Sequence, residues 1–154
     1  MGAKMLKIKV GIHIQKPVHE VFEAIVDPEI MSKYFILKGS GRLDEGAIIT
    51  WQFPEFDYQF QVRVFRISED KNVSFYWADI KGPITLVEIK LSEKDGSTFV
   101  RISEKERKDS KSGIKWMAQN TEGWANFLAC LKAYLEYGIN LRKGAFDSSQ
   151  IPEV

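Results

Sequence analysis

Few side chains in this sequence combine the type and the spacing that catalysis requires. Nucleophilic catalysis needs a cysteine or serine beside a base that a third group holds in place. The single cysteine, Cys130, lies within a helical run, whereas both histidines, His13 and His19, lie near the N-terminus. Glu55 and Asp57 are the best-placed carboxylate pair, but they flank a turn, where solvated acids are common. We therefore assign no catalytic residue, and an enzymatic activity is the less favoured interpretation.

The composition also argues against several classes of ligand. Two histidines and one cysteine fall short of a zinc ligand set, and no glycine-rich phosphate loop is present, so we expect no metal and no cofactor. Lys and Arg total 22 and Asp and Glu total 21, which leaves a net charge of +1 and no field that would attract nucleic acid. A single cysteine fits a reducing compartment, and no apolar run reaches the roughly 20 residues of a membrane span. We expect a soluble, cytoplasmic protein.

The length of 154 residues is typical of one domain, and its first segments predict a strand and two short helices. Apolar residues alternate over Met5–Ile14, which predicts a half-buried strand. Pro17 suits the first turn of a helix, and the helical spacing that follows it stops at Asp27. Asp27 can cap a second short helix from Pro28 to about Lys33.

From residue 46 to residue 107 the hydrophobic period changes to two, which predicts antiparallel hairpins. The expected strands are 46–53, 57–68, 72–78, 84–92 and 97–106. Asp95-Gly96 is the best turn signal, because both residue types accept the positive φ angles of tight hairpins. With the first strand they give a mostly antiparallel sheet of about six strands. The charge-dense run 101–111 is expected to be a solvated strand end and loop.

The last regular segment, 114–137, has helical periodicity and predicts one long amphipathic helix with Gly138 as its C-cap. The fold class is therefore α+β, with the helices on one side of the sheet. We expect residues 1–154 to form a single domain with its core at about 5–140 and a weakly ordered tail at 141–154.

A curved sheet around one helix is expected to leave an apolar space between the two, because a cylinder fills a curved trough poorly. We predict that this space is a ligand pocket. Its candidate lining consists of aromatic side chains of the strands and the long helix, with one amide: Trp51, Phe53, Tyr58, Phe60, Phe75, Trp77, Trp116, Asn120, Trp124 and Phe127.

Two residues of the long helix, Asn120 and Gly123, are unusual at their positions in an amphipathic helix. Asn120 lies on the apolar face, where an unpaired amide would cost on the order of 1–3 kcal/mol, so a group of the sheet, an internal water or a ligand should meet it. Gly123 precedes Trp124 within the helix, and its simplest interpretation is the close approach of a bulky neighbouring element.

Two runs resemble a known family. They are Val18–Ile25 followed by Asp27-Pro28-Glu29, and Glu122–Gly138 with its Gly-Trp, leucines at helical spacing and Tyr-Leu-Glu. Both are similar to the domain homologous to the C-terminal part of the activator of the 90-kDa heat shock protein ATPase. The resemblance covers about residues 8–140. Where the family often has Trp-Phe after the second helix, this chain has Tyr34-Phe35, so the opening of the pocket should differ.

The resemblance places the chain in the START-like (SRPBCC, birch-pollen-allergen-like) superfamily and implies a helix-grip fold. It implies a noncatalytic START-like domain that binds a small hydrophobic molecule, such as a lipid, between the sheet and the last helix. One alternative is a chaperone partner, with modulation of the 90-kDa heat shock protein ATPase. Another is a cyclase- or hydrolase-like enzyme that uses the same cavity, which would need an acid or base inside it.

Overall fold

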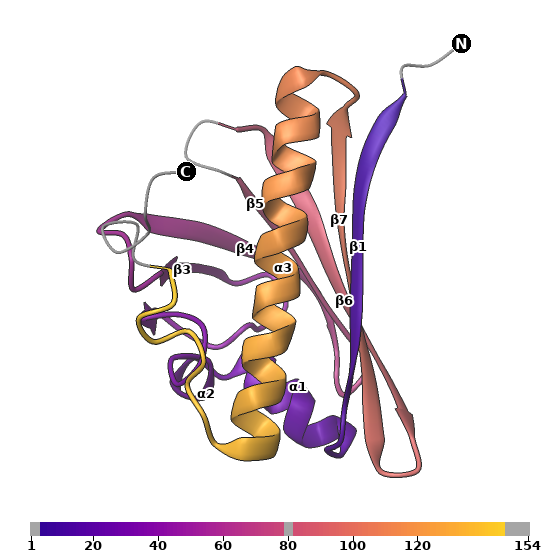
Figure 1. Cartoon of the computed structure of the whole chain (residues 1–154), viewed down its shortest axis with the longest axis vertical. Coiled ribbons are helices and arrows are strands. Elements are labelled where there is room, and N and C mark those ends of the chain that lie inside the picture. The colour runs from indigo at the N-terminus through magenta and orange to yellow at the C-terminus, as the bar shows by residue number, and fades with distance from the viewer. Residues whose placement is uncertain (1–3, 79–81, 147–154) are drawn as a thin grey trace.

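The strands form one antiparallel sheet, and a long helix lies across one of its faces (Figure 1). The computed structural model describes residues 4–78 and 82–146. The elements are β1 (Met5–Ile14), α1 (Val18–Val26), α2 (Pro28–Met31), β2 (Lys38–Gly39), β3 (Ile48–Gln52), β4 (Gln59–Ser68), β5 (Asn72–Ala78), β6 (Ile84–Lys94), β7 (Ser97–Lys108) and α3 (Lys111–Tyr137). The strand order is β1-β7-β6-β5-β4-β3-β2.

The architecture confirms the predicted α+β class with a long C-terminal helix over an antiparallel sheet. The expectation of about six strands is one short, because the described residues form seven. The strand that the sequence did not predict is β2, whose two residues, Lys38 and Gly39, pair with Gln52 and Trp51. A strand of two residues is too short to show an alternating pattern.

Two predicted helix caps and the predicted hairpin turn are confirmed by the structure. The Asp27 side chain accepts a hydrogen bond from the Glu29 backbone N at 2.9 Å and caps α2. Gly138 ends α3 with φ of 67°, and Asp95 and Gly96 turn between β6 and β7 with φ of 54° and 78°. The helix α3 begins three residues earlier than expected, because Ser110 caps it by accepting from the Gly113 backbone N at 3.1 Å.

The charge-dense run 101–111 is not the solvated strand end and loop that its composition predicted. Most of it belongs to β7, which lies between β1 and β6 in the sheet. Val100, Ile102 and Glu104 alternate onto the face that α3 covers, and all three are buried. Arg101, between Val100 and Ile102, is exposed on the other face, so a high charge count coexists with an interior strand.

After α3 the chain turns back and runs alongside α2 toward β3, as the yellow segment of Figure 1 shows. Arg142 in this segment forms an ion pair with Glu55 (Nη2–Oε1 2.6 Å), and both side chains are largely buried. Part of the predicted weakly ordered tail therefore has a defined contact with the domain. Residues 147–154 of that tail lie outside the described residues.

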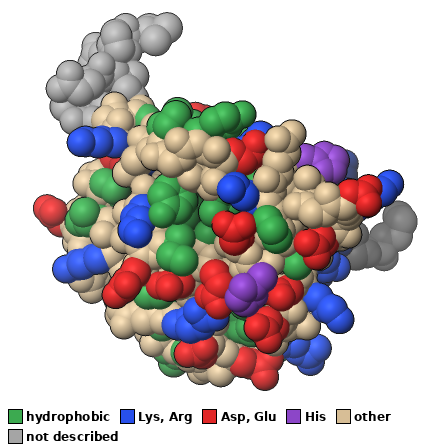
Figure 2. All heavy atoms as spheres, turned by 90° about the horizontal axis from the view of Figure 1, so that it is seen from below, with side chains coloured by type: hydrophobic (Ala, Val, Ile, Leu, Met, Phe, Trp, Pro, Cys, Tyr) green, Lys and Arg blue, Asp and Glu red, His purple; other side chains and the backbone are tan. Residues whose placement is uncertain are grey.

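Acidic and basic side chains are intermixed on the face seen from the end at which α1 lies (Figure 2). Ion pairs account for part of this pattern, for example Arg42 Nη1 with Glu23 Oε2 at 2.6 Å. Among the described residues, no helix is both long and apolar enough to cross a membrane.

Candidate functional site

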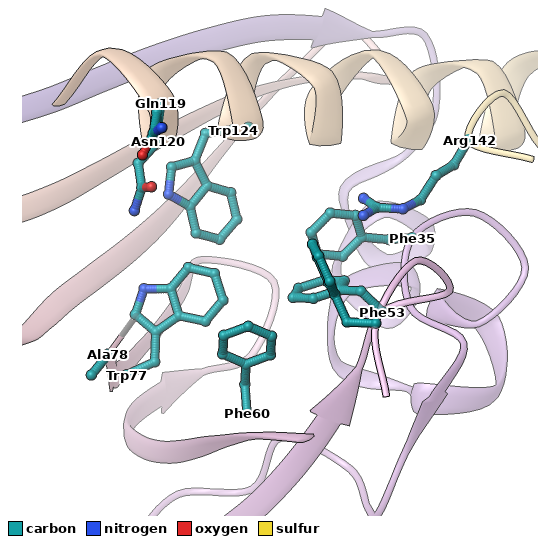
Figure 3. A pocket seen from close by; sticks show the side chains of 11 residues that line it. Phe35, Phe53, Phe60, Trp77, Ala78, Gln119, Asn120, Trp124 and Arg142 are labelled. Carbon is teal, nitrogen blue, oxygen red and sulfur yellow. The ribbon is translucent and has the colours of Figure 1, made fainter. Parts of the chain in front are cut away.

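A pocket of about 370 Å³ opens between α3, β4 and β5 and the segments that follow α2, β3 and α3. Its volume is in the range of small-molecule sites. Figure 3 shows most of its wall, with Asn120, Trp77 and Trp124 at one end and Arg142, Phe35 and Phe53 at the other. The lining residues are Phe35, Phe53, Phe56, Phe60, Trp77, Ala78, Gln119, Asn120, Gly123, Trp124 and Arg142.

The walls of the pocket are rings that touch one another edge to face or at a tilt. The ring centroids of Phe35 and Phe53 are 5.1 Å apart, those of Phe53 and Phe60 are 5.3 Å apart, and those of Trp77 and Trp124 are 5.4 Å apart. Contacts of this kind hold aromatic side chains in fixed orientations. The pocket therefore has preformed apolar walls that do not need to be assembled by a ligand.

A buried carboxylate lies behind the end of the wall that Trp77, Asn120 and Trp124 form. Glu104 on β7 is 1% exposed, and four uncharged groups donate to its two oxygens. Oε1 accepts from Trp124 Nε1 at 2.8 Å and from Asn120 Nδ2 at 3.1 Å. Oε2 accepts from Thr85 Oγ1 at 2.5 Å and from Trp77 Nε1 at 3.1 Å. We call these five residues the Glu104 cluster.

The register of the sheet brings the members of the Glu104 cluster together. Trp77 on β5 lies opposite Thr85 on β6, and Glu104 on β7 lies opposite Val87, two residues further along β6. Residues two apart share a face of the sheet, so Thr85 and Val87 project to the same side. Asn120 and Trp124 are four residues apart on α3 and therefore reach down from one face of the helix.

The opposite end of the pocket is closed by an arginine from the segment after α3. The Arg142 guanidinium carbon lies 4.9 Å from the ring centroid of Phe35 and 5.1 Å from that of Phe53. Nη2 and Nε of Arg142 contact the two carboxylate oxygens of Glu55 at 2.6 Å and 3.3 Å. This combination of ion pairing and cation–π contact fastens the C-terminal segment to the mouth of the pocket.

The structure brings five of the ten predicted lining residues to the pocket, namely Phe53, Phe60, Trp77, Asn120 and Trp124. Trp51, Phe75 and Phe127 are buried in the core next to these rings, for example with Trp51 5.3 Å from Phe75. Trp116 is also buried, near Arg107, and does not line the pocket. Tyr58 is 47% exposed, and its ring and that of Phe60 form a T-shaped contact.

The remaining lining residues were missed by the sequence analysis. Phe35 follows α2 and was considered only for its difference from the family pattern, while its neighbour Tyr34 is buried and donates its hydroxyl to the Ala24 carbonyl at 2.6 Å. Gly123 was read as a point of close approach, which is wrong, since a Cβ added there would meet no atom within 4 Å. It borders open space in the pocket wall instead.

The other candidate groups named from the sequence lie away from the pocket. His13 and His19 are exposed, and Asp57 is exposed near the turn that it was expected to flank. Cys130 is buried on α3, where desolvation raises the pKa of its thiol. Its burial is that of a structural cysteine rather than a nucleophile.

One cluster of potential metal ligands was not anticipated. His19, Glu69 and Asp70 each place one ligand atom within 4.8 Å of the others. Asp70 Oδ1 lies 2.9 Å from His19 Nδ1, and this hydrogen bond, followed by the charge of Asp70, raises the pKa of His19. The contact explains the grouping as an ion pair on the surface.

Comparisons with known proteins identify the family of this chain. The family described as "Activator of Hsp90 ATPase homolog 1-like protein" matches residues 15–136, which is most of the chain. The chain belongs to this family. No curated protein matches it. The activator-like match confirms the resemblance seen in the sequence, and it includes α1, α2, the strands from β2 to β7 and nearly all of α3.

Solved structures support the activator-like fold. The protein SSP2350 from Staphylococcus saprophyticus is 28% identical, with a TM-score of 0.78, and the match covers 89% of this chain and 96% of that chain. DynU16, from the dynemicin biosynthetic locus, is 26% identical, with a TM-score of 0.78, over 87% of this chain and 48% of that one. The Aha1 dimer from Colwellia psychrerythraea is 23% identical, with a TM-score of 0.73, over 86% of this chain and 98% of that chain, and shows the fold alone.

Proposed function

We propose that this protein binds a small, largely apolar molecule in the pocket between α3 and the sheet. The observation that carries the proposal is a preformed cavity of about 370 Å³ with six aromatic side chains in its wall. Burying about 250 Å² of apolar ligand surface at roughly 25 cal/mol/Å² would contribute on the order of 6 kcal/mol before the costs of association. Micromolar affinity would therefore need a good fit and a polar anchor.

The ionisable groups of the site favour binding over acid–base catalysis. Among the described lining residues, Arg142 is the one with an ionisable side chain, and Glu55 already pairs with it. Glu104 does not line the pocket, and its two oxygens accept four hydrogen bonds from side chains of the protein. A cyclase- or hydrolase-like reaction would need a group that is free to exchange a proton with the substrate.

The proposal is tested by filling the pocket without removing any existing contact. Both Gly123 and Ala125 are exposed positions of α3, but only Gly123 lines the pocket, and a Cβ added there meets no atom within 4 Å; Gly123→Leu therefore adds bulk at the pocket and Ala125→Leu adds the same side chain outside it. Naphthalene serves as an apolar probe, followed by quenching of Trp fluorescence and by calorimetry. We expect saturable binding to the wild type and to Ala125→Leu, and at least tenfold weaker binding to Gly123→Leu. The ligand-binding proposal would be refuted by a lack of saturable binding to the wild type, or by equal binding to all three proteins.

A second candidate function rests on the family description, which names an activator of the Hsp90 ATPase. In that case the protein would contact the chaperone and raise its rate of ATP hydrolysis. The test is the rate of ATP hydrolysis by a purified Hsp90, measured with and without a saturating concentration of this protein. An unchanged rate would dispose of this candidate and leave the ligand-binding proposal standing.

A further inference from the structure

The inference concerns which ligands the pocket selects, and it rests on the proposed function. Four polar side chains surround the end of the pocket opposite Arg142: Trp77, Gln119, Asn120 and Trp124 (Figure 3). Gln119 is exposed, whereas the other three each donate a hydrogen bond to Glu104. The two indole N–H groups are each a single donor, so both are fully engaged and cannot bind a ligand.

The Asn120 amide is oriented by the same carboxylate. A carboxylate accepts hydrogen bonds, so the amide must present Nδ2 to Glu104 Oε1, at 3.1 Å, and its oxygen is directed elsewhere. Within the described part of the chain, no donor meets Asn120 Oδ1. Because Asn120 is half-buried and lines the pocket, this oxygen is an acceptor that a ligand can reach.

The negative charge of Glu104 also favours a hydrogen-bond donor of the ligand at this end of the pocket. It lies directly behind Asn120 in an interior that screens charge weakly. A ligand O–H or N–H placed at this end brings a partial positive charge toward the carboxylate and is stabilised. An ether oxygen or an anionic group brings negative charge and is disfavoured.

We propose that the pocket selects apolar ligands that carry a hydrogen-bond donor, such as a hydroxyl or an amine, at the end that meets Asn120. The donor binds Asn120 Oδ1, and the Glu104 cluster supplies the orientation of the amide rather than a direct contact with the ligand. Asn126 is also a half-buried asparagine of α3, but it does not line this pocket. It therefore provides a matched control.

Three probes with the same ring system test this selectivity: 2-naphthol, 2-methoxynaphthalene and 2-naphthoate. We expect the naphthol to bind roughly three- to tenfold more tightly than the methyl ether, although the ether is the more apolar molecule. The naphthoate should bind more weakly than either. In Asn120→Leu the advantage of the naphthol should disappear, whereas in Asn126→Leu it should persist.

The outcomes separate this inference from the proposed function. If the naphthol and the ether bind equally, and Gly123→Leu weakens both, the pocket is a ligand site and the donor preference is refuted. A naphthoate that binds most tightly also refutes the preference. If none of the three probes binds the wild type, the proposed function and the inference fall together. Comparing the probes on the wild type keeps the test valid if Asn120→Leu does not fold.

Discussion

The indole Nε1 of Trp124 lies 2.8 Å from Oε1 of Glu104, and this hydrogen bond ties the middle of α3 to β7. Three further side chains, from β5, β6 and α3, donate hydrogen bonds to the same carboxylate. The aromatic wall of the pocket and the interior of the sheet therefore share one polar centre. If the pocket binds ligands as proposed, Glu104 would couple the stability of the fold to ligand recognition.

Substitutions of Glu104 should be costly. Glu104→Gln brings an amide N–H₂ toward groups that donate, so we expect a loss of about 2 kcal/mol in the free energy of unfolding. Glu104→Leu leaves all four donors without an acceptor and should cost at least about 3 kcal/mol. Urea denaturation followed by Trp fluorescence measures both. Glu106→Gln, on the same strand but exposed, should change stability by less than about 0.5 kcal/mol; equal effects at the two positions would contradict this account.

Two glycines of α3 should respond oppositely to alanine. Gly123→Ala adds a methyl group to open space and should stabilise the helix by about 0.5–1 kcal/mol. Gly113→Ala would bring a Cβ to 2.0 Å from the Lys108 carbonyl oxygen, so it should destabilise the fold despite the same gain in helix propensity. Thermal denaturation of the two variants gives the comparison. A destabilised Gly123→Ala would show that the open space beside it is absent.

Arg142 and Glu55 should be energetically coupled. Both side chains are largely buried, at 13% and 14% exposure, and the guanidinium also covers the rings of Phe35 and Phe53. We expect a coupling energy of about 1–2 kcal/mol in a double-mutant cycle of Arg142→Ala and Glu55→Gln, between the values of exposed and fully buried pairs. Additive effects of the two substitutions would mean that the ion pair does not fasten the C-terminal segment.

The pKa of His19 should be raised above its ordinary value of 6.5 by its hydrogen bond to Asp70 and by the charge of that residue. Because the pKa of His19 is raised in the folded state, its contact with Asp70 stabilises the fold fully below pH 6.5, the ordinary pKa. This contribution is lost as the pH rises through the pKa of the folded state. NMR titration of the His19 ring should show a lower pKa in Asp70→Asn, a change that tolerates the positive φ of 61° at this position. An unchanged titration would contradict the contact.

The sequence contained the signal for Glu104, but a second signal obscured it. Val100, Ile102 and Glu104 follow the period of two that places residues on one face of a strand, so the alternation alone predicts an inward carboxylate. The density of charge in 101–111 favoured a solvated segment instead. Asn120 was expected to need a partner, and Glu104 is that partner, from the sheet. Its identity depends on where α3 lies over β7, which no local pattern specifies.

The fold was predictable because long alternating and helical runs specify their own elements and the faces that they bury. The lining of the pocket was predictable only in part, since the pattern shows which side of the helix a ring is on but not which part of the sheet it meets. Trp116 and Trp124 share the apolar side of α3, yet Trp124 faces the pocket and Trp116 is buried near Arg107. Arg142 was missed because it reaches the pocket from beyond the last helix, where no periodicity exists.

The most direct test of the account is an amide and indole NMR titration of the wild-type protein with 2-naphthol. We predict saturable shifts concentrated at the indole N–H groups of Trp77 and Trp124 and at the backbone of Gly123, with Trp116 unaffected as an internal reference. Absence of shifts at millimolar probe, or shifts that spare these three groups, would contradict the claim that the pocket binds small apolar molecules.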